Sequence, residues 1–103
     1  HNDPVLSMLG IAAKSGNVVS GEFSTEKAVK TGHAYLVIVS AEASGNTKKS
    51  FCNMTDFYHV PCYCYGSKEA LGRCIGKEFR ASLAVTDENL ARAVEKKLKE
   101  RTV

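Results

Sequence analysis

The chain has 103 residues, 44% of them hydrophobic, which is enough for one core and predicts a single domain over residues 1–103. No apolar run could cross a bilayer and no signal-peptide pattern opens the chain, so we expect a cytoplasmic protein without a membrane partner. The formal net charge of +3 permits RNA binding but excludes a histone-like density of positive charge.

The first predicted element is a helix. Asp3 as N-cap and Pro4 in the first turn form a typical helix start. Apolar residues then recur with helical spacing up to Lys14, and Gly16 ends the segment.

A strand, helix and strand follow, and the rest of the chain is organised around this unit. A short strand at Val18 and Val19 turns at Gly21 into a helix of about two turns, which stops at Gly32. Residues 35–39 are continuously apolar and rich in β-branched side chains. That pattern is typical of an interior strand covered on both faces.

The turn at the start of this helix is a candidate binding site. Ser20 and Gly21 stand where backbone N–H groups have no partner inside the helix, and the helix dipole adds positive charge there, which suits an anionic ligand. Lys27 and Lys30 follow on the same helix. The alternative is that Ser20 is only an N-cap, Gly21 only a turn residue, and the lysines only solvated.

The second half of the chain continues the alternation of helices and strands. Lys48 and Lys49 in the first turn of the next helix oppose its dipole, and they serve either a phosphate or a solvated face. The later elements are a helix at 47–57, a strand at 60–65, a helix capped by Ser67 and stopped by Gly76, a strand at 81–85, and a helix that starts at Thr86 and Asp87. The pattern predicts an α/β fold, a three-layer α/β/α sandwich with a single mixed four-stranded sheet.

The residues that could carry chemistry do not indicate an enzyme, a metal site or a cofactor. No nucleophile or carboxylate stands beside a histidine in a recognisable arrangement, and the sequence has neither a P-loop nor a dinucleotide fingerprint. Cys62 and Cys64 are separated by one residue, a poor spacing for zinc, and His33 and His59 are isolated. We therefore expect the four cysteines to be buried, reduced thiols in the core.

The loop before the last strand is a second candidate site. It mixes the cations Lys77 and Arg80 with Glu78 and Phe79. In a sandwich of this kind, the loop and the turn at Gly21 can lie at the same end of the sheet and form one ligand surface. Phe79 is either exposed there or a core residue at the edge of the last strand.

Three parts of the chain carry a resemblance to a known family: Gly21 with Lys27, the segment KTGHAYLVIVSAEAS, and the segment HVPCYCYGSKEALGRCIG. In order and spacing they resemble the kink-turn RNA-binding family of ribosomal proteins, the large-subunit seven-Ae and thirty-e types, and within it the small bacterial YlxQ-like branch. The resemblance covers Val5 to Val94. It implies an α/β/α sandwich that binds structured RNA without catalysis, metal or cofactor.

The resemblance also implies site residues. In the family, the helix after the first strand opens with a glycine, an Asn-Glu pair and a lysine, which read the sheared G·A pairs of a kink-turn. Gly21 and Lys27 match this pattern, whereas Phe23 and Ser24 replace the Asn-Glu pair and remove its polar groups. The family's later loop packs on a flipped-out base and corresponds here to the loop with Phe79, which would stack on an unpaired base.

We therefore predict a monomeric protein that binds structured RNA, either kink-turn-like or ribosomal, with ribosomal proteins as further candidate partners. The predicted RNA-binding residues are Gly21, Glu22, Phe23, Ser24, Lys27, Lys30, Lys77, Glu78, Phe79 and Arg80. Two alternatives stay open. One is a protein-interaction adapter of the same fold with little RNA affinity, and the other is an RNA-binding accessory domain of the kind fused to ribose methyltransferases, here standing alone.

Overall fold

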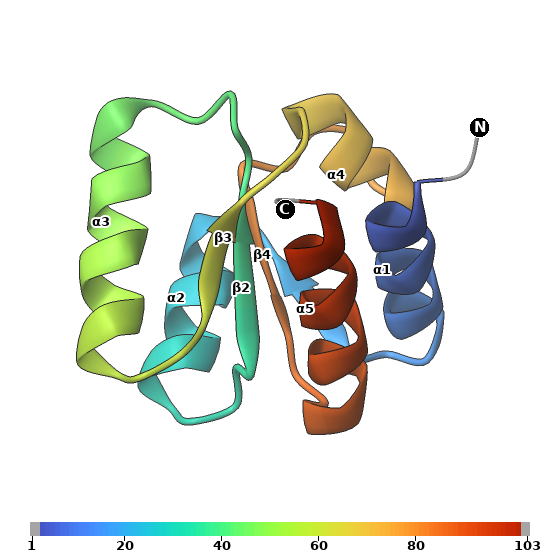
Figure 1. The fold of residues 1–103 in the computed structure, drawn as a ribbon. Helices are drawn as coiled ribbons and strands as arrows, with labels where there is room; N and C mark the ends of the chain where they lie inside the picture. The colour runs from blue at the N-terminus through green and yellow to red at the C-terminus, as the bar shows by residue number, and fades with distance from the viewer. Residues whose placement is uncertain (1–2, 102–103) are drawn as a thin grey trace.

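Among residues 3–101, which the computed structural model describes, four strands form one sheet between two layers of helices (Figure 1). The strands are β1 (Val18–Ser20), β2 (Leu36–Val39), β3 (Cys62–Cys64) and β4 (Ser82–Val85). The helices are α1 (Pro4–Lys14), α2 (Glu22–Lys30), α3 (Gly45–Phe57), α4 (Lys68–Cys74) and α5 (Glu88–Arg101). The predicted α/β/α sandwich is confirmed.

The sheet is mixed, as predicted, and its strand order is β1-β4-β2-β3. β4 pairs antiparallel with both β1 and β2, whereas β3 pairs parallel with β2 at one edge. Every residue of β2 and β4 is buried, because helices cover both faces of these two central strands. Since β1, β2 and β3 run in the same direction, the helices that follow them, α2, α3 and α4, all begin at one end of the sheet.

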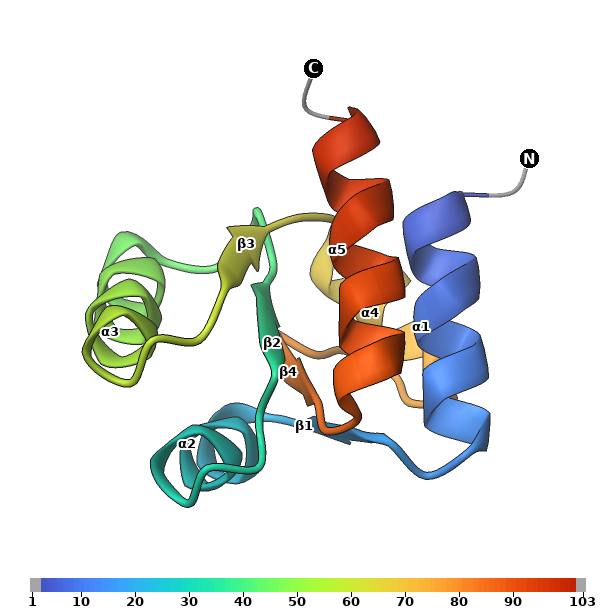
Figure 2. The same ribbon diagram turned by 60° about the horizontal axis from the view of Figure 1, so that its bottom comes forward.

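Side chains that alternate along the strands divide the core into two layers. Leu36 and Ile38 of β2 pack with α1, α4 and α5, whereas Val37 and Val39 pack with α2 and α3. Figure 2 shows these two groups of helices on opposite sides of the sheet. This packing holds α2 on one face and α4 on the other, so that the starts of both helices frame the same end of the sheet.

The largest differences from the predicted boundaries are in β3 and α3. The strand predicted at 60–65 is limited to Cys62–Cys64, because the N–H of Val60 still donates to the carbonyl oxygen of Thr55 (2.8 Å) at the end of α3. α3 begins at Gly45 rather than at residue 47, since Ser44 is its N-cap and accepts a hydrogen bond from the N–H of Thr47 (3.1 Å).

The cysteines do not lie where the sequence analysis expects them. All four are free, but Cys52 and Cys64 are exposed and Cys62 and Cys74 are only half-buried. The expectation of buried thiols is wrong for Cys52 and Cys64. Cys52 follows the buried residue Phe51 and therefore lies on the outward face of α3, and Cys64 is the last residue of an edge strand. Burial raises the pKa of Cys62 and of Cys74 to about 11, which keeps both thiols protonated near neutral pH.

Asp3 caps α1 and also ties it to the segment after β3. One carboxylate oxygen accepts a hydrogen bond from the N–H of Val5 (2.9 Å), and the other accepts one from the hydroxyl of Tyr65 (2.6 Å). Partial burial opposes ionisation, but the hydrogen bonds from Tyr65, Leu6 and Val5 outweigh it and lower the pKa of Asp3 below its ordinary value of 3.8.

We expect Asp3→Ala to lower the free energy of unfolding by about 1 kcal/mol at neutral pH, the usual cost of a lost N-cap. Because the pKa of folded Asp3 is depressed, this stabilisation is present above the unfolded pKa and is lost as the pH falls through the folded value. Urea unfolding should show the difference between wild type and variant shrinking below about pH 4. A difference that stays constant down to about pH 2 would contradict the role of the charged carboxylate.

Candidate nucleic-acid interface

The turn between β1 and α2 presents backbone donors. Gly21 is the N-cap of α2 and has φ of 91°, a conformation that residues with a side chain rarely adopt. Its own N–H donates to the carbonyl oxygen of Ser82 (2.9 Å), which fixes the turn against β4. No side chain caps this end of α2, so its first N–H groups face outward without a side-chain partner. The alternative in which Ser20 is the N-cap is therefore wrong.

Ser20 instead joins this turn to the loop between α4 and β4. Its hydroxyl oxygen accepts a hydrogen bond from Nε of Arg80 (2.9 Å), and another nitrogen of the same guanidinium donates to the carbonyl oxygen of Phe79 (2.7 Å). The backbone N–H of Arg80 donates to the carbonyl oxygen of Lys68 (3.0 Å) at the start of α4. The two candidate regions therefore meet at one end of the sheet.

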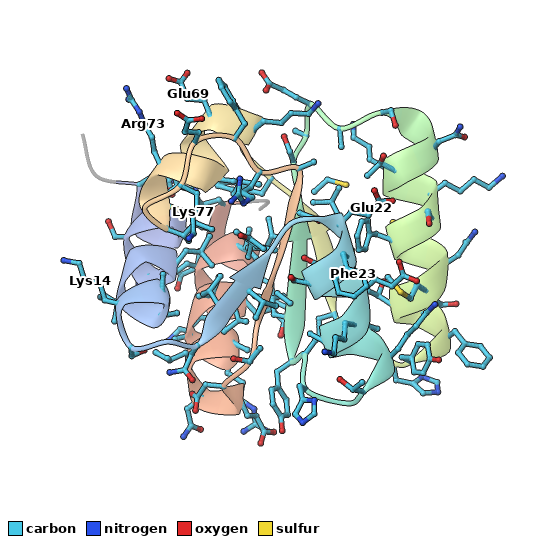
Figure 3. The ribbon with its side chains drawn as sticks, turned by 180° about the vertical axis from the view of Figure 1, so that it is seen from behind. Lys14, Glu22, Phe23, Glu69, Arg73 and Lys77 are labelled. Atoms are coloured by element: carbon cyan, nitrogen blue, oxygen red, sulfur yellow. The ribbon has the colours of Figure 1, made fainter. Side chains whose placement is uncertain are left out.

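Two phenylalanines project from this end. Phe23 is 78% exposed and Phe79 is 64% exposed, so the alternative in which Phe79 belongs to the core is wrong. Lys27 lies four residues after Phe23 and therefore on the same face of α2. Figure 3 shows Phe23 on α2 and Lys77 on the α4 side of the sheet. Exposed aromatic rings with cations beside them suit a ligand that offers flat bases and phosphates.

Gly72 holds the loop that carries Phe79. A Cβ at this position would lie 2.0 Å from the carbonyl oxygen of Glu78 and 2.9 Å from the backbone nitrogen of Phe79. The N–H of Lys77 also donates to the carbonyl oxygen of Gly72 (2.8 Å). The backbone of the loop thus rests directly on α4, and the loop keeps its conformation while its side chains stay outside the core.

One of the predicted RNA-binding residues lies away from this end of the sheet. Lys30 lies at the far end of α2, where its ammonium contacts the carboxylate of Glu26 at 2.6 Å. The hydrogen bond with Glu26 raises the pKa of Lys30. Glu22 and Glu78 do lie at the candidate site and are exposed carboxylates, which disfavour a phosphate immediately beside them.

Three further lysines lie at this end of the sheet and are absent from the predicted set. Lys48 stands in the first turn of α3 with Lys49 directly after it, and Lys68 stands in the first turn of α4. None of the ion pairs among residues 3–101 includes them. Their positive charge adds to that of the helix N-termini. The sequence pattern that indicates these lysines is a positive charge near the N-terminus of a helix, where the helix dipole disfavours it.

The described part of the chain holds no group of three or more His, Cys, Asp or Glu side chains that could bind a metal ion. None of its helices combines the length and the apolar character that a membrane span requires.

Known proteins resemble this chain over most of its length. The profile of the Ribosomal protein L7Ae/L30e/S12e/Gadd45 family matches residues 3–97. RNA-binding protein YlxQ of Bacillus subtilis (strain 168) is 40% identical over 84 residues, which cover 82% of this chain and 84% of that protein. Large ribosomal subunit protein eL30 of Methanoregula boonei is 35% identical over 72 residues, which cover 69% and 71%. The resemblance noted from the motifs is confirmed.

Solved structures share the fold. A Bacillus halodurans protein described as having unknown function superimposes with a TM-score of 0.92 at 34% identity, covering 95% of this chain and 99% of that one. The Giardia lamblia 15.5kD RNA binding protein superimposes with a TM-score of 0.80 at 22% identity, covering 97% and 89%. At that identity the second match concerns the fold alone.

Proposed function

Because the chain belongs to the Ribosomal protein L7Ae/L30e/S12e/Gadd45 family, we propose that it binds structured RNA at the end of the sheet where α2 begins. Two of its relatives are named as an RNA-binding protein and as a protein of the large ribosomal subunit. The observation that carries the proposal is the pair of exposed rings, Phe23 and Phe79, on two segments that the Arg80–Ser20 hydrogen bond joins.

Each part of the site supplies a different contact with RNA. Phe79 offers an apolar face to an unpaired base, and Phe23 offers a second one. Lys27 and Lys77 contact phosphates, as does the part of the Arg80 guanidinium that does not bind Ser20. The free N–H groups of the first turn of α2 donate to acceptor atoms of the RNA.

The proposal includes the character of the protein as well as its ligand. The chain is a single-domain, non-catalytic monomer that works in the cytoplasm on ribosomal or kink-turn RNA and needs no cofactor. Family membership supports the binding of RNA in this description.

Binding to a kink-turn hairpin, compared with the same hairpin after its G·A pairs are replaced, tests the proposal. We expect tighter binding to the intact kink-turn and a steep loss of affinity as salt rises, because phosphate contacts release counterions. The double variant Lys27→Ala with Arg80→Ala should reduce the slope of log affinity against log salt by about 1.5, since each phosphate contact adds about 0.7 to 0.9.

The outcomes separate three cases. Equal and salt-sensitive binding to both hairpins would make the protein a general binder of RNA surfaces. Unchanged binding by the double variant would place the site elsewhere. Absence of RNA binding would refute the proposal.

A second candidate function, an adapter that binds a protein, is favoured by one observation. Phe57 and Tyr58 are 74% and 40% exposed at the end of α3 away from the RNA site, with their rings edge to face at 5.0 Å. An apolar protein contact there would change little with salt, whereas RNA binding falls steeply. Ribosomal proteins are the partners we propose for this second function.

A further inference from the structure

We infer that the RNA-binding surface continues from Phe79 across α4 to the end of α1, where Lys14 and Arg73 contact phosphates of the same RNA. The inference rests on the proposed function, and it extends the site to two residues outside the predicted set. Lys14 ends α1 and Arg73 lies in the last turn of α4. Figure 3 shows both, with Lys77, on the α1 and α4 side of the molecule.

Two adjoining hollows connect Phe79 with Lys14. The first, of about 250 Å³, is lined by Arg73, Lys77 and Phe79 and by two carboxylates, those of Glu69 and Glu78. The second, of about 310 Å³, lies between α1 and α4 and has both Arg73 and Lys14 in its wall. Because Arg73 lines both hollows, an RNA strand can pass from the exposed ring of Phe79 to Lys14 along one continuous surface.

The charge of the second hollow favours phosphate. Lys14 and Arg73 are the charged residues in its wall, so this wall carries positive charge alone. Lys14 takes part in none of the ion pairs among residues 3–101. Arg73 contacts Glu69 at 3.7 Å, but their side chains are 77% and 59% exposed, and such a pair leaves the guanidinium accessible.

The floor of the second hollow lets a strand approach between the two cations. A Cβ at Gly10 of α1 would lie 3.1 Å from the carbonyl oxygen of Cys74, so α1 and α4 pack closely there. Gly10 and Gly76 add no side chain to the hollow, and Ala13 adds a methyl group. The half-buried side chains of Cys74 and Ile75 complete the wall.

On the same face of the sheet as α1 and α4, α5 pairs three of its five cations with glutamates. On α5, Arg92 contacts Glu88 at 2.7 Å, Lys97 contacts Glu100 at 3.9 Å, and Lys99 contacts Glu95 at 3.9 Å. Lys96 and Arg101 lie outside these three pairs, so α5 keeps an excess of two positive charges. The hollow between α1 and α4 differs from the surface of α5 in that no carboxylate of residues 3–101 lies in its wall, whereas Glu95 and Glu100 line the hollow on α5.

The test compares two charge-removing variants on hairpins of two lengths. The short hairpin holds a kink-turn with minimal stems, and the long versions extend one stem or the other by a full helical turn. Lys14→Gln with Arg73→Gln removes the proposed contacts. Lys96→Gln with Lys97→Gln is the matched control, because it also removes one cation outside the described ion pairs and one paired with a glutamate, both from α5.

We expect wild type to bind one of the long hairpins more tightly than the short one. Lys14→Gln with Arg73→Gln should remove that gain, about tenfold at low salt, and reduce the salt slope by about 1.5 on the long hairpin alone. Wild-type affinity in this variant, an equal loss in the control, or an equal loss on both hairpin lengths would each overturn the inference. Absence of RNA binding by wild type would instead refute the proposed function, and this inference with it.

Discussion

Gly72→Ala should lower the free energy of unfolding by about 2 kcal/mol and weaken RNA binding about tenfold, although alanine is normally the better helix residue. In a helix interior the replacement of glycine by alanine contributes about 0.5 to 1 kcal/mol of stability. Here the new methyl group would lie 2.0 Å from the carbonyl oxygen of Glu78 and 2.4 Å from its carbon. These are backbone atoms and cannot rotate away, so the overpacking cost of about 1 to 3 kcal/mol prevails.

The steric clash between the new methyl group and Glu78 should affect RNA binding as well as the free energy of unfolding. Relief requires the backbone at Glu78 and Phe79 to move, which displaces the ring proposed to contact RNA. Gly45→Ala is the control, because nothing lies within 4 Å of its Cβ at the start of α3. Urea unfolding and RNA titration should leave Gly45→Ala close to wild type. A Gly72→Ala protein with wild-type stability and RNA affinity would show that the loop is not held by α4.

Local patterns in the sequence were sufficient to predict the helices, the strands and the layered architecture. The continuous apolar run that ends in β2 predicted an interior strand, and all four residues of β2 are buried. Asp3 and Ser67 were identifiable as the N-caps of α1 and α4, and each side chain accepts a hydrogen bond from the first turn of its helix. The alternation of helices and strands then leaves few arrangements other than a covered sheet.

The burial of the cysteines could not be predicted from local patterns in the sequence. The identity of a cysteine says nothing about whether its strand is central or at an edge, and β3 proved to be an edge strand. Exposure of Cys64 follows from that position in the sheet, which depends on pairings between distant segments. Lys30 is the opposite case. Its pairing with Glu26 at 2.6 Å follows from the spacing of four residues on a helix and could have been predicted.

The candidate site depends on contacts between distant residues. Ser20 and Arg80 are 60 residues apart in sequence, yet their hydrogen bond brings the two halves of the site together. The close approach of Gly72 to the loop is equally invisible in the sequence, because a glycine in a helix has many possible reasons. The residue types indicated which segments could bind RNA, and the predicted sandwich allowed them to lie at one end of the sheet. The hydrogen bond between Arg80 and Ser20 that joins them is visible only in the tertiary structure.

Phe79→Ala should weaken binding to a hairpin with an unpaired base by about 1 to 3 kcal/mol, the usual range for one base stacked on an aromatic side chain. That range corresponds to roughly 5-fold to 150-fold in affinity. Because Phe79 is 64% exposed, the variant should change the free energy of unfolding by less than about 0.5 kcal/mol. Loss of affinity would then reflect the missing contact and not a loss of fold.

Two further variants make the interpretation specific. Phe57→Ala removes an even more exposed ring, at 74%, from the opposite end of the sheet, and RNA titration should leave its affinity at the wild-type value. Phe79→Leu keeps an apolar side chain without a π face, so partial recovery of affinity would indicate apolar packing on the base in place of stacking. If Phe79→Ala and Phe57→Ala bind the hairpin equally well, the ring of Phe79 does not contact the RNA, and the proposed site loses the residue on which it chiefly depends.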